Sequence, residues 1–192
     1  MPPSKPTKKA NATNQIRINA GVWRSRILKF PDVEGLRPTP ERVRITIFNW
    51  LGQDLTGKHC LDLFAGTGVF GFEALSRGAS AVVMVENSKL ALTALSQNQA
   101  LLKADNCQLF FGDALNFLAE NTQKFDVIFC DPPYNKAWLD KLLPALNQYL
   151  TNNGVLYVEA EYEIKSDAIW QVTKQNKAGN VFYQLLSPVI HA

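Results

Sequence analysis

The sequence has few of the side chains that usually bind transition metals, with three cysteines and two histidines in 192 residues. The histidines, His59 and His191, lie far apart in the chain, and no cysteine has a partner at the spacing of a zinc ligand pair. We therefore expect no metal site. An odd number of cysteines inside apolar stretches also argues against a disulfide framework and indicates buried, reduced thiols in a cytosolic protein: Cys60, Cys107 and Cys130.

Long apolar segments are also missing. No run reaches the roughly 18 residues of a membrane-spanning helix, and the polar N-terminus lacks the apolar segment of a secretory signal. These two absences predict a cytoplasmic protein that does not enter a membrane. With 192 residues, 46% of them hydrophobic, the chain is long enough for one substantial core, so we expect one domain with a small appendage.

Charge is unevenly distributed along the chain. Residues 1–44 contain ten Lys and Arg and three acids, a net charge of +7. The rest of the chain contains ten Lys and Arg and fourteen acids, a net charge of −4. A cationic segment on a mildly acidic body is typical of a protein that binds a phosphate backbone. A disordered, solubilising tail is the better interpretation of residues 1–15 alone. The other arginines lie in segments that look structured, and they are the candidate phosphate contacts: Arg17, Arg24, Arg26, Arg37, Arg42 and Arg44.

The first structured part of the chain is predicted as a β-hairpin followed by a helix. Two strand-like runs, 16–19 and 22–30, are separated by Ala20-Gly21. After a loop at 31–39, a helix is expected to begin with a Thr39 hydroxyl cap, proline in its first turn and an acid at Glu41, and to end near Leu51. The predicted units are a basic tail, a hairpin with its loop, and one large domain: 1–15, 16–38 and 39–192.

From Lys58 onward, apolar strands alternate with amphipathic helices. This alternation predicts an α/β fold, with a parallel sheet covered by helices on both faces. The strands are expected at 59–64, 81–86, 107–112, 125–130 and 154–160, the helices at about 69–78, 88–103, 114–121 and 136–150, and a closing hairpin at 168–175 and 181–187.

A glycine-rich loop follows the first of these strands and opens a helix. Its glycines, Gly66, Gly68 and Gly71, match a nucleotide-binding fingerprint, and Glu86 follows at the end of the next strand. A match of this kind is common, so it establishes a nucleoside-binding site and little more. Glu86 is placed to bind the two hydroxyls of a ribose.

The charges around this loop favour a cationic cofactor over a dinucleotide. Asp62 lies at the strand end before the loop, Asp113 follows the third strand, and the loop itself carries no Lys or Arg to meet a pyrophosphate. A cofactor with a sulfonium and an ammonium group and no phosphate is S-adenosylmethionine. Asp113 is equally well explained as the N-cap of the next helix, and the two roles are compatible. An NAD-dependent oxidoreductase remains an alternative.

The most informative motif is Asp131-Pro132-Pro133-Tyr134, directly behind the apolar run 125–130. Two prolines end the strand and fix a rigid turn. The turn holds a carboxylate, a carbonyl oxygen and an aromatic ring in a fixed arrangement. The two oxygens can accept hydrogen bonds from an exocyclic amino group, and the ring can stack on the flat base that carries it. The alternative is a strand-ending turn with a solvated Asp131 and a packed Tyr134.

Taken in order, these motifs resemble the class I S-adenosylmethionine-dependent methyltransferases that act on amino groups. The N-terminal part is similar to the RsmD family of bacterial 16S rRNA guanine-N2-methyltransferases, most specifically over Leu36-Arg37-Pro38-Thr39-Pro40-Glu41-Arg42-Val43-Arg44. The resemblance extends from about Ile16 to Ser187. Ile45-Thr46 departs from it, because family members often carry an acid next to the threonine.

The resemblance implies a Rossmann-like sheet of seven strands whose last strand is antiparallel, and a small N-terminal β appendage that contacts RNA. It also implies methylation of the N2 amine of a guanine in 16S rRNA. We expect a monomer that acts on a small-subunit assembly particle, with naked RNA and the finished subunit as the alternative substrates. The remaining alternatives are another amino-methyltransferase (adenine-N6 of DNA or RNA, or a protein amide) and a non-catalytic RNA-binding module.

The predicted site residues fall into three groups. They are, for catalysis, Asp131, Pro132 and Tyr134; for the cofactor, Asp62, Phe64, Ala65, Gly66, Gly68, Glu86, Asn87, Asp113 and Ala114; and for RNA, Arg17, Arg24, Arg26, Arg37, Thr39, Arg42 and Arg44.

Overall fold

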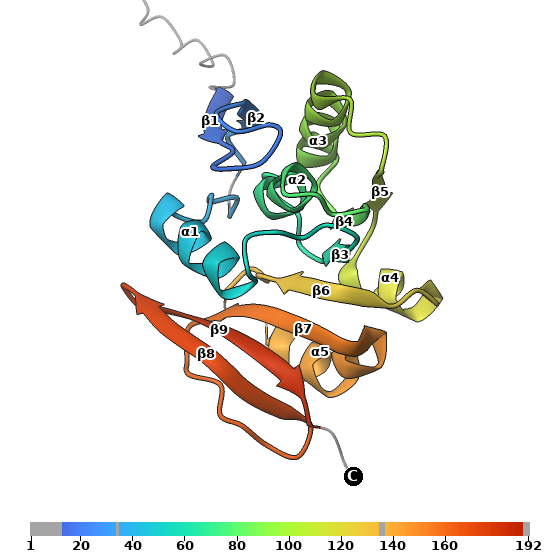
Figure 1. Ribbon diagram of the computed structural model, residues 1–192. Coiled ribbons are helices and arrows are strands. Elements are labelled where there is room, and N and C mark those ends of the chain that lie inside the picture. Colours follow the sequence, from blue (N-terminus) through green and yellow to red (C-terminus); the bar gives the residue numbers. More distant parts are fainter. Residues whose placement is uncertain (1–12, 34, 135–136, 190–192) are drawn as a thin grey trace, which may run out of the picture.

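The computed structural model describes residues 13–33, 35–134 and 137–189, and it is built around a sheet of seven strands in the order β5-β4-β3-β6-β7-β9-β8 (Figure 1). All neighbours pair in parallel except β9, which is antiparallel to both β7 and β8. The predicted seven-stranded sheet with an antiparallel last strand is confirmed. The strands are β3 (His59–Asp62), β4 (Ala81–Glu86), β5 (Cys107–Phe111), β6 (Phe125–Cys130), β7 (Leu150–Ala160), β8 (Trp170–Ala178) and β9 (Val181–Pro188).

Helices cover both faces of this sheet, because successive strand residues point to opposite sides. One core cluster joins Cys60, Val82 and Val127 to the helices α1, α2 and α3, and the other joins Leu61, Val83 and Ile128 to α4 and α5. The helices are α1 (Glu41–Trp50), α2 (Val69–Ser76), α3 (Lys89–Leu102), α4 (Ala114–Glu120) and α5 (Trp138–Leu146), the last followed by a 3₁₀ turn (Asn147–Tyr149). From Lys58 onward the predicted helices and strands are all present; most ends agree within two residues, whereas β7 begins four residues earlier than expected and α5 ends four residues earlier.

Side chains cap two of the helices as their sequences suggest. The Ser88 hydroxyl accepts a hydrogen bond from the Ala91 N–H at the start of α3, and Asp113 accepts one from the Leu115 N–H at the start of α4. The prediction that the Thr39 hydroxyl caps α1 is wrong. The N-cap residue is Pro40 and no side chain bonds the first turn, because the buried Thr39 hydroxyl faces carboxylates of the sheet.

The N-terminal hairpin differs from its prediction. Its strands are β1 (Thr13–Arg17) and β2 (Ile27–Pro31), with Arg17 opposite Ile27, so residues 13–15 belong to a strand and not to a tail. Residues 22–26 form a turn, where a strand was expected. The local reason is the left-handed backbone at Gly21 (φ 79°) and Ser25 (φ 69°), which no continuous strand can contain. The rest of the predicted tail, residues 1–12, lies outside the described residues.

Hydrogen bonds attach this hairpin to the main domain. The Glu73 carboxylate of α2 accepts from the N–H groups of Asn19 (2.7 Å) and Ala20 (3.0 Å), and the Ser76 carbonyl accepts from the Val22 N–H (2.8 Å). On the other side, the Asn98 amide of α3 exchanges two hydrogen bonds with the backbone of Lys29 in β2. The appendage is therefore held against α2 and α3, beside α1 (Figure 1).

The three cysteines are free and buried, as expected. Burial raises the pKa of Cys60 and of Cys107 to about 12, so both thiols stay protonated at neutral pH. Within the described ranges, no helix is long and apolar enough to cross a membrane, and no cluster of three or more candidate ligands is arranged to hold a metal ion.

Candidate active site

The glycine loop and the Asp131–Tyr134 turn meet at the point where the strand order reverses. β3 begins the parallel series; β4 and β5 extend it to one side, and β6 and β7 to the other. The loop follows β3 and the turn follows β6, and these two strands are hydrogen-bonded neighbours with Asp62 opposite Phe129. In open α/β sheets, ligands bind in the crevice at the carboxyl ends of the strands on either side of such a reversal.

The glycines of the loop are required for different structural reasons. An added Cβ at Gly68 would lie 2.4 Å from the Leu95 side chain, and one at Gly71 would lie 2.3 Å from Met84, so these two glycines allow close packing inside the domain. At Gly66 (φ 50°) the nearest atoms would be 3.8 Å away, in Leu36 and the backbone of Phe64. Gly66 thus leaves room over the loop, where a ligand can approach the backbone.

Glu86 holds the loop in place from the end of β4. One of its oxygens accepts from the Gly66 N–H (2.8 Å) and the other from the Ser88 N–H (2.7 Å), and the side chain is mostly buried. A carboxylate can accept about four hydrogen bonds, so two acceptor positions are available for hydroxyls of a ligand. Asn87, the next residue, is exposed.

Asp62 lies beneath the loop, and its side chain is 2% exposed. Its carboxylate accepts from the Gly71 N–H at 3.1 Å. The pKa of Asp62 is raised to about 7, chiefly by burial; the Gly71 hydrogen bond opposes the shift, and the negative charge of Glu86 adds to it. This carboxyl is a structural support for the loop as well as a candidate group for a cationic ligand.

The Asp131–Tyr134 turn presents the groups that its sequence suggests. Pro132 is buried, Asp131 is partly exposed, and the Tyr134 ring is 42% exposed. Burial raises the pKa of Asp131 well above its usual range, with further contributions from the charges of Glu159 and Asp62, while a hydrogen bond from Thr39 lowers it. The exposed ring excludes the interpretation of Tyr134 as a packed core residue.

Two residues of this site were missed or misplaced by the sequence interpretation. Glu159, near the end of β7, is 6% exposed and accepts a hydrogen bond of 2.5 Å from the Tyr157 hydroxyl. The Thr39 hydroxyl lies near the carboxyl groups of both Asp131 and Glu159 and lowers the pKa of each. Thr39 is 7% exposed, so it belongs to this pocket and not to an RNA-contacting surface. An acid at the carboxyl end of an otherwise apolar strand was the available signal for Glu159.

The remaining predicted cofactor residues border the same crevice. Phe64 of the loop packs edge-on against Trp138 at the start of α5, with ring centroids 5.3 Å apart. Ala65 is buried, and its N–H donates to the Val85 carbonyl. Asp113 has the N-cap role foreseen for it, and its contact with a cofactor stays a prediction, as does that of the buried Ala114.

The predicted RNA-contacting arginines separate into exposed and buried ones. Arg44 is 2% exposed and donates to the Arg17 carbonyl (3.0 Å) and the Asn19 side chain (2.5 Å). It also forms an ion pair with the buried Glu73 (3.7 Å). Its assignment to RNA is therefore corrected: Arg44 joins the hairpin to α1 and α2. The other members of the set are exposed: Arg17, Arg24, Arg26, Arg37 and Arg42.

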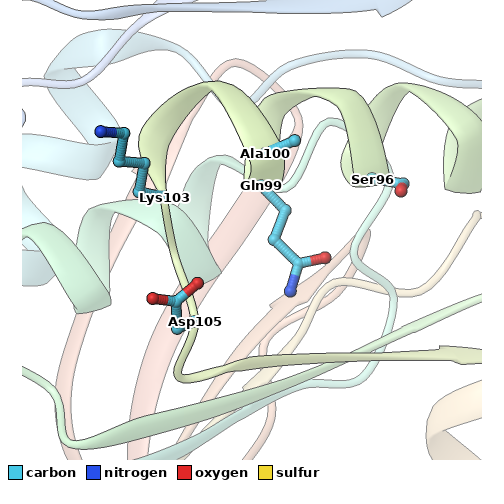
Figure 2. Close-up of a pocket in the computed structure, with 5 residues that line it drawn as sticks. All are labelled: Ser96, Gln99, Ala100, Lys103 and Asp105. Atoms are coloured by element: carbon cyan, nitrogen blue, oxygen red, sulfur yellow. The ribbon is translucent and has the colours of Figure 1, made fainter.

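A separate pocket lies on the outer side of α3. It has a volume of about 350 Å³ and is lined by Ser96, Gln99, Ala100, Lys103 and Asp105 (Figure 2). None of these residues belongs to the predicted site, and the Gln99 amide donates to the Cys107 carbonyl, which is a structural bond.

Comparison with known proteins agrees with this geometry. The family model described as Conserved hypothetical protein 95 matches residues 16–187. A relative named Ribosomal RNA small subunit methyltransferase D, from Escherichia coli, is 39% identical over 185 residues, which cover 93% of each chain. The protein of the same name from Haemophilus influenzae is 38% identical, covering 91% of this chain and 95% of its own.

Solved structures agree as well. The Escherichia coli protein yhhF superposes with a TM-score of 0.82 at 38% identity, covering 91% of this chain and 98% of its own. The ribosomal protein L11 methylase of Lactobacillus delbrueckii superposes with a TM-score of 0.63 at 20% identity, over 81% of this chain and 82% of its own, which shows a shared fold.

Proposed function

Because the chain belongs to the Conserved hypothetical protein 95 family, the family of Ribosomal RNA small subunit methyltransferase D, we propose that it methylates the N2 amine of a guanine in 16S rRNA, with S-adenosylmethionine as the methyl donor. One observation carries the proposal: the open Gly66 loop and the Asp131–Tyr134 turn lie at the ends of the paired strands β3 and β6. A methyl donor and an amino acceptor bound at these two places would be neighbours.

The residues of the loop fit S-adenosylmethionine. Gly66 leaves the backbone accessible, and the acids Asp62, Glu86 and Asp113 surround a loop without a basic side chain. This suits a cofactor with positive charge and ribose hydroxyls and does not suit a pyrophosphate. When bound, the cofactor supplies a methyl group on a sulfonium. Phe64, Ala65, Gly68, Asn87 and Ala114 complete the proposed cofactor contacts.

The chain's own residues prepare the amine. The N2 group of guanine is conjugated with its ring and is a weak nucleophile. Asp131 and the Pro132 carbonyl each accept one of its hydrogens, which orients the nitrogen lone pair and stabilises the positive charge that develops on nitrogen. Tyr134 stacks on the base and holds it in plane. No covalent enzyme intermediate is needed for a direct displacement.

The exposed arginines are the proposed RNA contacts. Arg24 and Arg26 lie in the turn of the N-terminal hairpin, and Arg37 follows in the loop that leads to α1. The charge of Arg37 lowers the pKa of Tyr134, which supports a position on the RNA path to the site. We propose that residues 16–38 guide the RNA toward the domain formed by 39–192, with a small-subunit assembly particle as substrate and the enzyme acting as a monomer in the cytoplasm.

Two measurements test the proposed function. Calorimetric titration with S-adenosylmethionine and with NAD should detect binding of the first alone. Mass mapping of nucleosides in 16S rRNA, from cells with and without the gene, should reveal one N2-methylguanosine that requires the gene. Loss of an N6-methyladenosine instead would favour the adenine-directed alternative, and unchanged 16S rRNA would contradict the proposal.

A further inference from the structure

Asp131 has a second carboxylate directly beside it. β6 and β7 are parallel neighbours with Cys130 opposite Val158, so the next residues along the two strands, Asp131 and Glu159, follow at the same edge of the sheet. Neighbouring strands are about 4.8 Å apart. This register brings the two side chains together; the Thr39 hydroxyl acts on the pKa values of both, and the charge of Glu159 raises the pKa of Asp131.

Among the described residues, these two acids have fewer hydrogen-bond donors than they can accept. Each carboxylate accepts about four hydrogen bonds, whereas a hydroxyl has one proton to give. In that part of the chain Thr39 lies beside the pair with a single proton, and the Tyr157 hydroxyl donates to Glu159 from within the core. Burying carboxylates with unused acceptor positions is costly. The arrangement therefore favours a ligand that brings several donors side by side.

The proposed substrate has such an edge. Guanine presents its N1–H next to the N2 amine, so the edge that carries the methylated nitrogen consists of donors only. In adenine the ring N1 is an acceptor, which a carboxylate repels. The exposed Tyr134 ring, whose titration is influenced by both Asp131 and Glu159, lies close enough to stack on a base facing the two acids.

We propose that Glu159 accepts the N1–H of the target guanine while Asp131 accepts a hydrogen of its N2 amine. Glu159 is then the residue that selects guanine over bases whose N1 is an acceptor. Sites built to bond a particular donor discriminate strongly against analogues that lack it, because their own buried polar groups are left unpaired. This inference rests on the proposed function, since it assigns a specificity role within the same site.

The test uses substrates that keep the amine and lose the neighbouring donor. 2-Aminopurine retains the N2 amine, but its N1 carries no hydrogen. Small-subunit particles would be assembled with 16S rRNA that carries either guanine or 2-aminopurine at the methylated position. The wild-type enzyme should methylate guanine with a kcat/KM at least about tenfold higher. Equal rates with the two bases would overturn the inference, and this comparison does not require a variant.

The variant Glu159→Gln gives the second arm. A glutamine can still accept from Tyr157, but its NH₂ group can donate to the N1 of 2-aminopurine, so the preference for guanine should shrink by about tenfold or more. Tyr157→Phe is the control variant, because it removes the hydrogen bond from Tyr157 to Glu159 and leaves the carboxylate; it should keep the preference even where its total rate falls. Binding of S-adenosylmethionine and the unfolding temperature verify that both variants are folded.

The outcomes separate the inference from the proposed function. An unchanged guanine preference in Glu159→Gln, with N2-methylguanosine still formed, overturns only the role of Glu159. If the wild-type enzyme methylates adenine, or transfers no methyl group to the particle, the proposed function fails and the inference fails with it. A reduced preference in Glu159→Gln, with an intact preference in Tyr157→Phe, supports both.

Discussion

At the scale of single residues, carboxyl groups determine the character of the site. Asp62, Glu86, Asp131 and Glu159 occupy the ends of neighbouring strands, and each has a distinct set of hydrogen-bond donors. Glu86 holds the loop, Asp62 supports it from below, and Asp131 and Glu159 face the proposed base. Burial raises the pKa of Asp62, Asp131 and Glu159, so these three acids are sensitive to any change that admits water or removes a donor.

Asp131→Ala should separate chemistry from cofactor binding. Its proposed partner is the amine, and its contribution is greatest in the transition state, so turnover should fall more than about 100-fold. Affinity for S-adenosylmethionine, measured by calorimetry, should stay within a few-fold. Tyr134→Phe keeps the ring, so its turnover should fall only mildly, whereas turnover in Tyr134→Ala should fall severely. A variant Asp131→Ala that loses mainly cofactor affinity would contradict the acceptor role.

Asp62 should make stability depend on pH. In the folded protein its carboxyl keeps a proton up to about pH 7, whereas the unfolded chain loses that proton near the ordinary pKa of 3.8. The folded state therefore binds more protons in this window, and the free energy of unfolding falls as pH rises through it. Asp62→Asn removes this contribution, so the stability of the variant relative to wild type should increase between pH 4 and pH 7 in urea titrations. A difference that does not change with pH would mean that Asp62 ionises normally.

At the scale of elements, the docking of the N-terminal hairpin on α2 depends on one glycine. At Gly21 the backbone has φ 79°, and an added Cβ would lie 1.7 Å from the Ser76 carbonyl oxygen. Gly52 has a similar conformation, φ 90°, with nothing within 4 Å of an added Cβ. The two positions therefore differ in contact and not in backbone strain.

Gly21→Ala should accordingly cost much more stability than Gly52→Ala. The left-handed conformation costs about 1–2 kcal/mol at both positions, and the clash with α2 adds about 1–3 kcal/mol at Gly21 alone. Chemical denaturation of the two variants measures the difference. Limited proteolysis should also cleave the 13–33 segment faster in Gly21→Ala. Equal losses of stability would show that the hairpin is not held by the contact with Ser76.

The elements that the sequence predicted well are those with a local signal. β4 and β6 were located to the residue, because unbroken apolar runs end at a loop or a proline. The turn at 22–26 was mistaken for a strand, because its apolar Val22 and Trp23 look like strand residues, and their contact with α2 is not visible in the sequence. Arg44 was assigned to RNA from its charge, whereas its buried partner Glu73 lies 29 residues away in the chain. Glu159 was missed because its importance depends on the register of β6 with β7.

At the scale of the whole molecule, the chain joins a cationic appendage to a domain whose strand ends carry the acids of the proposed site. Hydrogen bonds to Glu73, Ser76 and Asn98 fix the hairpin against α2 and α3, so its exposed arginines have a defined position relative to the site. RNA held by its phosphates on this surface could present one extruded base to the carboxylates. Affinity and base selection would then be separate properties, carried by different parts of the molecule.

Removal of Arg24 and Arg26 should weaken RNA binding in a salt-dependent way. For single-stranded RNA the logarithm of affinity falls by about 0.7 per phosphate contact per tenfold rise in salt, so the double variant to glutamine should reduce the slope by about 1.4. Binding of S-adenosylmethionine should be unaffected. The matched control replaces Lys103 and Lys174, two exposed lysines far from the hairpin in sequence, with glutamine. Its RNA affinity should have the same salt dependence as that of the wild type. If both double variants retain the wild-type affinity and slope, the hairpin turn is not an RNA-binding surface.

The central claim is that this protein methylates guanine N2 in 16S rRNA, and methyl transfer in vitro tests it most directly. Small-subunit particles from cells that lack the gene would be incubated with the purified protein and S-adenosylmethionine carrying a tritiated methyl group. The RNA would then be digested to nucleosides and separated. We predict that the label co-elutes with N2-methylguanosine, close to one methyl group per particle, and that Asp131→Ala gives almost none. Label in N6-methyladenosine or in ribosomal protein, or no transfer at all, would contradict the account.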